Sequence, residues 1–303
     1  MAFQLSIIIP AHNRPRILQK TLDCIAAQTI LKRGSPSTRS SARVDFLARE
    51  EQPIEVIIVS DGPDEKTAEM LTNLSWPFEI QYFAVPKSQQ GVCRNRAVER
   101  ARSPLVLLIG DDIFLAPDAC ERHMKAHERG ESSMMVLGYT TWDPSLTITP
   151  LMRWMEQSGV QFGYPKLERY RSAFVPPRIQ QWFTYTSNLS LPAKILYQNQ
   201  FREDALLYGW EDIEWGKRLM DRGVPLFYEP DAKAYHHHAY ADEEVWKRSC
   251  MLGRSAVALE SLVPSLRILP RGIKKIAYAI IGLFPSYRGR HFREFLRGMR
   301  SAR

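Results

Sequence analysis

The chain has 303 residues, 45% of them hydrophobic and 24% charged, which suits one large globular domain or a domain with an appendage. The formal charge of +8 is uneven, because residues 246–303 hold 13 Lys or Arg residues and only two acids, Glu260 and Glu294. No apolar run approaches the roughly 20 residues of a membrane-spanning helix, no signal peptide is visible, and the four cysteines form no C-x-x-C pair. These features suggest no disulfide framework and lead us to expect a cytoplasmic protein.

The first half of the chain alternates short apolar runs with segments of helical periodicity. The runs predict strands at 5–9, 54–59, 80–85 and 105–109, and the periodic segments predict helices at 15–27, 64–74 and 91–101. Strands that alternate with helices imply βαβ units. We therefore predict an α/β fold with a Rossmann-like, mostly parallel sheet flanked by helices.

A Ser-, Arg- and Pro-rich stretch interrupts this pattern, and we interpret residues 31–53 as a mobile insertion with a short helix at 44–50. Further on, we predict strands at 184–191 and 225–228 and a helix at 212–222 that Gly223 ends. The chain beyond Asp242 is basic and helical in pattern. We expect a catalytic domain at 1–240 and a basic amphipathic helical region at 241–303.

Three predicted strands end in polar loops, at residues 10–14, 60–62 and 111–112. The carboxyl ends of parallel strands meet at one edge of the sheet, where ligands bind. Asp61 and Asp112 would each be explained by capping a turn or helix, but three such loops at one edge favour a binding crevice. Adjacent carboxylates at Asp111 and Asp112 repel each other, and a hard divalent cation, Mg²⁺ or Mn²⁺, would remove that penalty.

The first turn has no G-x-G-x-x-G and the chain has no G-x-x-x-x-G-K-[ST]. The sequence therefore argues against an NAD-dependent dehydrogenase and against a P-loop nucleotidase.

An ordered set of motifs resembles the family-2 glycosyltransferases, which have the A-type glycosyltransferase fold. The set is Ser-Ile-Ile-Ile-Pro-Ala-His-Asn-Arg (6–14), Val-Ile-Ile-Val-Ser-Asp-Gly (56–62), the segment 91–118, Thr-Ser-Asn-Leu-Ser-Leu (186–191) and Tyr-Gly-Trp-Glu-Asp-Ile-Glu-Trp-Gly-Lys-Arg-Leu (208–219). The resemblance covers roughly residues 4–240. Two positions depart from it: Ser60 and Gly110 stand where many members carry aspartate, which affects nucleobase preference and sugar contacts.

The resemblance implies a role for each matching residue. Donor contacts fall to Pro10, Asn13, Asp61 and Arg94, with Asp61 on the nucleoside. Asp111 and Asp112 would hold the metal and the diphosphate, Asp112 most directly. Asp212 would be the catalytic base, with Glu211 beside it near the acceptor.

The resemblance implies transfer of a sugar from a nucleotide-sugar donor to a glycan or lipid-linked acceptor. The reaction would be a single inverting displacement in which Asp212 takes the proton of the acceptor hydroxyl. The acids at this helix start also complement the helix dipole. That simpler reading leaves the preceding Gly209 and Trp210 unexplained.

Three consecutive histidines, His236 to His238, form the last motif. In a strand His236 and His238 share a face. Three histidines suggest zinc, but no H-E-x-x-H and no nearby cysteine accompany them. The resemblance places a histidine here near the metal and diphosphate, and we favour His236, with His238 as the alternative.

The basic C-terminal region suits either a solvated extension or contact with an anionic membrane surface, and we favour the membrane. No nucleic-acid-binding motif is visible, so we expect no nucleic acid partner. Two other functions stay open: a nucleotidyl- or sugar-phosphate transferase, and a non-catalytic glycan- or lipid-binding protein on the same fold.

Overall fold

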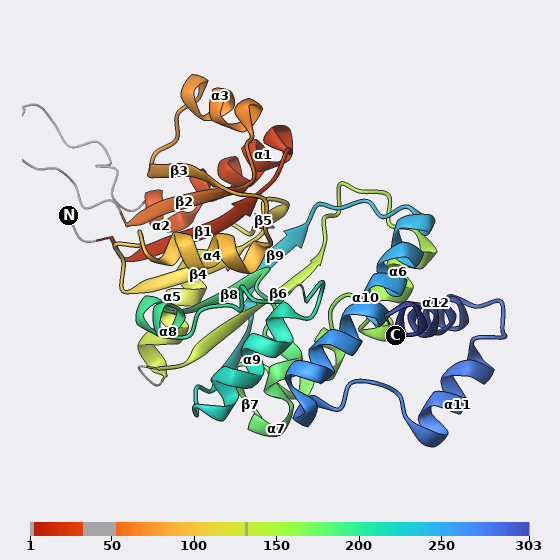
Figure 1. Ribbon diagram of the computed structural model, residues 1–303. Helices are drawn as coiled ribbons and strands as arrows, with labels where there is room; N and C mark the ends of the chain where they lie inside the picture. Colours follow the sequence, from red (N-terminus) through yellow and green to blue (C-terminus); the bar gives the residue numbers. More distant parts are fainter. Residues whose placement is uncertain (1–2, 33–52, 131–132, 206, 303) are drawn as a thin grey trace, which may run out of the picture.

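The computed structural model describes residues 3–32, 53–130, 133–205 and 207–302 (Figure 1). The expected insertion at 31–53, with its helix at 44–50, falls almost entirely outside the described residues. Its visible edge is α2 (Thr29–Lys32), a single helical turn.

Four parallel strands form the first half of the sheet, in the spatial order β3-β2-β1-β4. They are β1 (Leu5–Ala11), β2 (Ile54–Asp61), β3 (Glu79–Val85) and β4 (Leu105–Ile109). The intervening helices are α1 (Pro15–Ala26), α3 (Glu65–Asn73) and α4 (Gln90–Val98). All seven predicted elements are present, and the predicted α/β class is confirmed.

The second half of the sheet is mixed, and it continues the order as β8-β6-β9-β5, with β7 paired to β9. The strands are β5 (Ile113–Leu115), β6 (Met135–Trp142), β7 (Ala173–Val175), β8 (Asn188–Pro192) and β9 (Leu226–His236). β8 runs antiparallel to β4 and to β6, whereas β6 and β9 are parallel. Every antiparallel pair of the described sheet therefore includes a strand of this second half.

Two predicted strands differ from the structure. The strand predicted at 184–191 begins only at Asn188, and the one predicted at 225–228 extends to His236. Pro230 hid this extension, because proline normally stops a strand. The register between β6 and β9 shifts at Gly138, so that Pro230 falls at an irregularity and the strand continues.

The remaining helices of the catalytic region cover the sheet and its edges (Figure 1). They are α5 (Ala119–Arg129), α6 (Pro150–Ser158), α7 (Pro177–Gln180), α8 (Ala193–Gln198) and α9 (Glu211–Asp221), with 3₁₀ turns at Tyr164–Lys166, Glu168–Tyr170 and Gln181–Phe183. α9 ends where predicted, since Gly223 has a positive φ of 75°.

The core lies on both faces of the sheet. Ile8 and Ile57 belong to one buried cluster, whereas Ile7 and Ile58 belong to the other. Successive strand residues point to opposite faces, so continuous apolar strands require cover on both sides. This rigid sheet fixes the polar loops that follow β1, β2 and β4.

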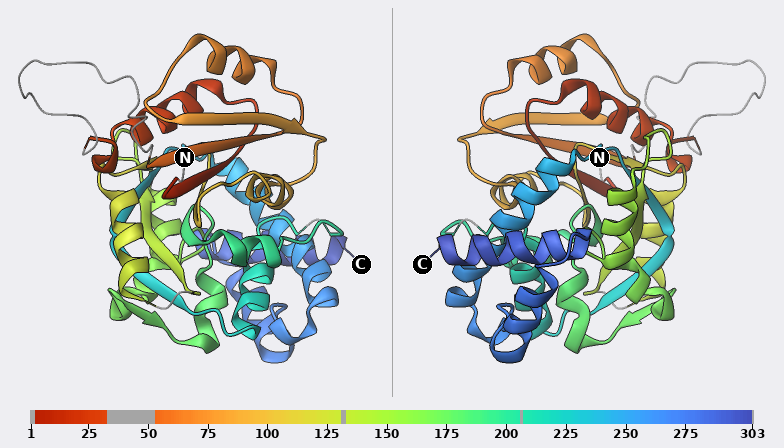
Figure 2. Two further views of the ribbon diagram at one scale, coloured as in Figure 1. Left: turned by 90° about the vertical axis from the view of Figure 1, so that its left-hand side faces the viewer. Right: turned by 90° about the vertical axis from the view of Figure 1, so that its right-hand side faces the viewer.

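The C-terminal region is helical, as predicted, and Figure 2 shows its helices gathered on one side of the molecule. α10 (Asp242–Leu262), a 3₁₀ turn (Pro264–Leu266), α11 (Gly272–Ile281) and α12 (Tyr287–Ser301) follow in order. α10 and α12 cross closely through glycines: a Cβ on Gly298 would lie 1.9 Å from the carbonyl oxygen of Cys250. No helix within the described ranges is long and apolar enough to cross a membrane.

Candidate functional site

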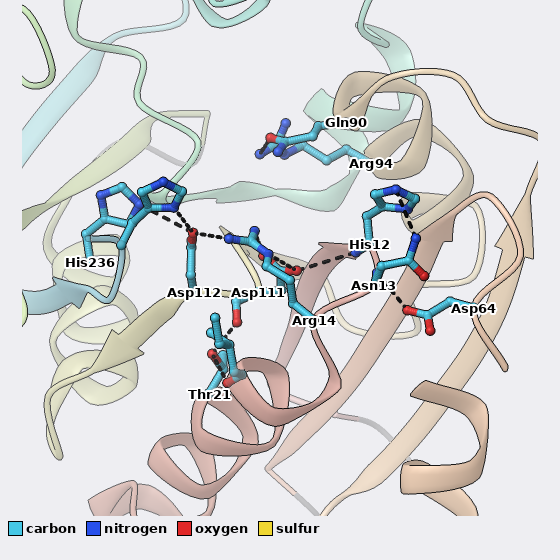
Figure 3. A network of polar contacts seen from close by, with 12 residues as sticks. His12, Asn13, Arg14, Thr21, Asp64, Gln90, Arg94, Asp111, Asp112 and His236 are labelled. Carbon is cyan, nitrogen blue, oxygen red and sulfur yellow. Dashed lines mark hydrogen bonds and ion pairs between the residues drawn. The ribbon is translucent and has the colours of Figure 1, made fainter. Parts of the chain in front are cut away.

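Asp112 sits at the edge of the sheet, between the end of β4 and the start of β5. β5 pairs antiparallel with β9 so that Ile113 lies opposite His236. The backbone N–H of His237 also donates to the carbonyl oxygen of Asp112, at 2.8 Å. This pairing brings Asp112 beside a histidine that lies 124 positions later in the chain (Figure 3).

Two of the three histidines face Asp112. Asp112 Oδ2 lies 3.4 Å from His236 Nε2 and 3.5 Å from His238 Nδ1. His237 points away, with Nδ1 2.5 Å from Asp143 Oδ2. Burial alone would raise the pKa of the Asp112 carboxyl, but hydrogen bonds from His236 and His238 hold it well below its ordinary value.

Asp112, His236 and His238 form a candidate metal site. Their ligand atoms all lie within 4.8 Å of one another, so one ion can contact all three. The Nδ1 of His236 is buried without a hydrogen-bond partner in the described structure. Sequence reasoning offered His236 or His238 as alternatives, whereas the fold brings both to Asp112.

Arg14, at the start of α1, binds both neighbouring carboxylates, and sequence reasoning assigned it no role. Its Nη1 donates to Asp112 Oδ2 at 2.8 Å, its Nε donates to Asp111 Oδ2 at 3.2 Å, and its Nη2 forms an ion pair with Asp111. The predicted repulsion between Asp111 and Asp112 is thus relieved by an arginine in this structure. Its position in the polar loop after β1 was the available signal.

Asp111 stands apart from the histidine cluster. Its carboxylate faces Arg14 and the backbone N–H of His12, which donates at 3.4 Å. Burial raises the pKa of Asp111 to about 6, the charge of Arg14 opposes that rise, and the charge of Asp112 adds to it. Asp111 was predicted as a metal ligand, but the described cluster contains Asp112 alone of the pair.

The loop after β1 is held in place by a backbone hydrogen bond to Asp64. Pro10 lies inside β1 opposite Val59 rather than in the loop. Asn13 has a positive φ of 52°, and its backbone N–H donates to Asp64 Oδ2 at 2.9 Å. Asp64 also caps α3 through Thr67, so the first polar loop is fastened to the second.

Asp61 ends β2 and is bound by the segment between β3 and α4. Lys87 Nζ donates to Asp61 Oδ2 at 2.8 Å, and the backbone N–H of Ser88 donates to Oδ1 at 2.6 Å. Burial opposes ionisation, but the Lys87 hydrogen bond and the Ser88 N–H lower the pKa of Asp61. Sequence reasoning missed Lys87 and Ser88, because nothing in a single chain pairs them with β2.

Arg94 is buried on α4 with an incompletely satisfied guanidinium. Its Nη2 lies 3.4 Å from Gln90 Oε1, whereas Nε and Nη1 have no hydrogen-bond partner among the described residues. In Figure 3 Arg94 and Gln90 lie above the pair formed by Asp112 and Arg14. Buried donors without partners are rare in folded proteins, so this arginine fits an anionic ligand.

Asp212 lies in the first turn of α9, held from the loop before β8. The Thr186 hydroxyl is 2.9 Å from Asp212 Oδ1, and the Thr186 backbone N–H donates to Oδ2 at 3.1 Å. Burial raises the pKa of Asp212, while the positive charge of Arg94 opposes the rise. Arg94 is therefore electrostatically linked to the start of α9.

Glu211, immediately before Asp212, has a buried Oε2 without a hydrogen-bond partner in the described part of the chain. Burial, with a smaller contribution from the charge of Asp212, raises its pKa to about 7. A carboxyl group of this kind exchanges protons near neutral pH.

Trp210, whose role the sequence does not explain, makes a structural contact with α10. Its indole N–H donates to the carbonyl oxygen of Leu252 in α10, at 2.9 Å. The ring thus links α9 to the C-terminal helices. Gly209 has a positive φ of 71°, which accounts for the small residue before it.

Comparison with known proteins gives a consistent result. Residues 6–188 match the family model described as Glycosyl transferase family 2. Validoxylamine A glucosyltransferase of Streptomyces hygroscopicus subsp. jinggangensis is 26% identical over 247 residues, covering 73% of this chain and 52% of that protein. Glycosyltransferase AglE of Haloferax volcanii is 22% identical over 293 residues, covering 93% of this chain and 81% of AglE. The chain thus spans about half the length of the first of these relatives.

Solved structures share the fold at low sequence identity. The mannosyltransferase PcManGT from Pyrobaculum calidifontis, in complex with GDP-Man and Mn²⁺, superposes with a TM-score of 0.61 at 13% identity, covering all of this chain and 87% of that one. Residues 1–349 of S. aureus TarS in complex with UDP-GlcNAc give a TM-score of 0.56 at 12% identity, covering 99% and 91%. The expected A-type glycosyltransferase fold is confirmed.

Proposed function

Because the chain belongs to glycosyl transferase family 2, we propose that it moves a sugar from a nucleotide-sugar donor to a glycan or lipid-linked acceptor, with metal assistance and inversion. The observation that carries this proposal is the placement of buried Arg94. Two nitrogens of its guanidinium have no hydrogen-bond partner among the described residues, and its charge acts on Glu211 and Asp212 at the start of α9. One buried cation would thereby serve both the donor diphosphate and a pair of candidate bases.

On the donor side, Asp61 would bind the nucleoside and Arg94 the diphosphate. Asp61 is ionised and oriented by Lys87 and Ser88, so it can accept hydrogen bonds from hydroxyl or N–H groups of the nucleoside. The Nε and Nη1 of Arg94, which have no partner among the residues that the structure describes, would donate to phosphate oxygens. Asn13 would line the same crevice through its exposed loop.

Asp112, His236 and His238 would hold the divalent cation. A bound ion would supply charge neutralisation for the departing nucleoside diphosphate. Two imidazoles and one carboxylate suit Mn²⁺ better than Mg²⁺, because Mg²⁺ prefers an all-oxygen shell. Arg14 would then hold Asp111.

Asp212 would act as the general base. Its carboxylate takes the proton of the acceptor hydroxyl while that oxygen attacks the anomeric carbon, and the bonding electrons leave with the nucleoside diphosphate. Thr186 fixes the carboxylate from one side, and the raised pKa of Asp212 makes it a stronger base. A single displacement of this kind inverts the anomeric centre.

The test separates Asp212 from Glu211. We expect Asp212→Asn to lower turnover by about 10²–10⁴-fold, as loss of a general base does. The donor dissociation constant should stay close to that of the native chain, because Asp61 and Arg94 are untouched. Glu211→Gln should keep most of the turnover and change the acceptor KM instead.

The measurement is kcat, acceptor KM and donor affinity for both variants on one acceptor, with the anomeric configuration of the product read by NMR. A retained configuration would rule out the single displacement. A larger loss of kcat in Glu211→Gln than in Asp212→Asn would make Glu211 the base.

A further inference from the structure

α11 (Gly272–Ile281) and the turn after it expose a set of large apolar side chains. Ile273 is 86% exposed and Leu283 81% exposed, and Ile276, Ile280 and Phe284 are each more than half exposed. No residue of α11 itself is buried. Residues 273, 276 and 280 recur at helical spacing along one side of α11, and together with Leu283 and Phe284 in the following turn they form the exposed apolar stripe.

The stripe is presented by a fixed helix. On the inner side of α11, the ring of Tyr278 stacks on Phe292 of α12 with centroids 3.9 Å apart. Before α11, buried Glu260 accepts the backbone N–H of Leu269 at 2.7 Å and pairs with Arg271. After it, Arg293 Nη1 donates to the carbonyl oxygen of Gly282 at 3.2 Å. The exposed stripe is therefore a built surface of the folded protein.

The surroundings of the stripe are strongly cationic. Residues 264–303 contain ten Lys or Arg residues and one acid, Glu294. Lys274 and Lys275 are exposed on either side of the inward-facing Tyr278, and neither forms an ion pair with a carboxylate of the described residues. Their long side chains can reach the level of lipid headgroups while the stripe points into the acyl region.

We propose that α11 is a membrane-inserting helix that lies in the plane of an anionic lipid surface. An apolar face with cationic flanks and no acid is the composition of an interfacial helix. Pairing of two copies through this face would bring like charges together, which disfavours a dimer. α10 and α12 are assigned no part in insertion, because they bury most of their large apolar residues against each other and the catalytic region.

The experiment is co-sedimentation of the full chain with vesicles of phosphatidylglycerol and phosphatidylcholine, or of phosphatidylcholine alone, over a range of salt. The native chain should bind the anionic vesicles more tightly, and less so as salt rises. Ile273→Ser combined with Ile276→Ser and Leu283→Ser should weaken binding by at least about tenfold. Lys274→Gln with Lys275→Gln should remove part of the salt-sensitive binding.

The matched control is Leu74→Ser with Tyr197→Ser, which removes exposed apolar residues elsewhere and should bind vesicles like the native chain. Thermal unfolding shows that each variant is folded. Hydrogen exchange should slow in α11 when vesicles are added. Undiminished vesicle binding by the stripe variant would overturn the proposal. The proposal would also be wrong if the native chain bound no vesicles and instead self-associated in a way that the stripe substitutions abolish. Sugar transfer is not measured, so failure here leaves the proposed activity untouched.

Discussion

Arg14 is the residue that most changes the interpretation of the site. It occupies the position between Asp111 and Asp112 at which the sequence analysis placed a cation. Arginine is always charged, so one of the two carboxylate charges is balanced whether or not an ion is bound. An ion at Asp112, His236 and His238 would therefore share one carboxylate with Arg14.

We expect Arg14→Gln to destabilise the metal-free protein, because two neighbouring buried carboxylates would lose their cation. Breaking a buried pair costs several kcal/mol, and partial exposure of Arg14 reduces the expected loss to about 1–3 kcal/mol. Mn²⁺ should restore more stability to this variant than to the native chain, because the ion then replaces the missing charge. Thermal unfolding in EDTA and in Mn²⁺ measures both effects.

The control for Arg14 is Arg16→Gln, an exposed cation two residues further along α1. Asp112→Asn should lose the Mn²⁺ stabilisation altogether. If Mn²⁺ stabilises Asp112→Asn as strongly as the native chain, the ion does not bind at Asp112.

The raised pKa of Glu211 makes the free energy of unfolding depend on pH. Its pKa is about 7 in the folded protein against an ordinary value of 4.5, so the folded state binds more protons between these values. The free energy of unfolding should therefore fall as pH rises from about 4.5 to about 7, by at most about 1.4 kcal/mol per pH unit from this group. Glu211→Gln should flatten that slope in denaturant unfolding.

Asp111 contributes a slope of the same sign, so the informative quantity is the difference between the native chain and Glu211→Gln. The matched control is Glu65→Gln on the exposed side of α3. A slope unchanged by Glu211→Gln would show that this carboxyl is not held protonated by the fold.

At the level of elements, Trp210 joins α9 to α10. We expect Trp210→Phe to lower the free energy of unfolding by about 1 kcal/mol, because the aromatic ring stays and only one hydrogen bond is lost. Hydrogen exchange in α10 should quicken, while turnover changes little. Trp215→Phe is the matched control, since its indole N–H bonds the Asn199 carbonyl and not α10. A large loss of turnover without destabilisation would instead place the Trp210 indole on the acceptor.

Elements with an uninterrupted local pattern were predictable from the sequence. β1, β2 and β4 are mostly apolar runs, and α9 carries its own end signal at Gly223. The three residues of β5 are too few to show a period, and β9 is interrupted by Pro230. These two strands are fixed by pairing with each other and with β6, which no local pattern encodes.

The same limit applies to the site. The acids at strand ends could be placed at one edge from the order of the strands. The partnership of Arg14 with Asp112, and of Thr186 with Asp212, depends on loop geometry across distant segments. The roles of Asp61, Arg94, Asp112 and Asp212 in transfer stay predictions.

At the scale of the whole molecule, charge is divided between two regions. Residues 246–303 carry about +11, so the rest of the chain carries about −3 within the total of +8. The sequence pattern predicts one amphipathic surface over the whole C-terminal region. In the structure α10 and α12 are packed, and exposed apolar residues concentrate on α11.

The pairing of β5 with β9 also sets an order in time. During synthesis the parallel half of the sheet emerges first, and with it Arg14, Asp111 and Asp112. His236 and His238 leave the ribosome much later, and β5 has no partner in the described sheet until β9 arrives. We therefore expect Arg14 to form its ion pairs with Asp111 and Asp112 in the nascent chain before the histidines arrive. A divalent cation would therefore find the carboxylate of Asp112 and the imidazoles of His236 and His238 together only after β9 has paired with β5.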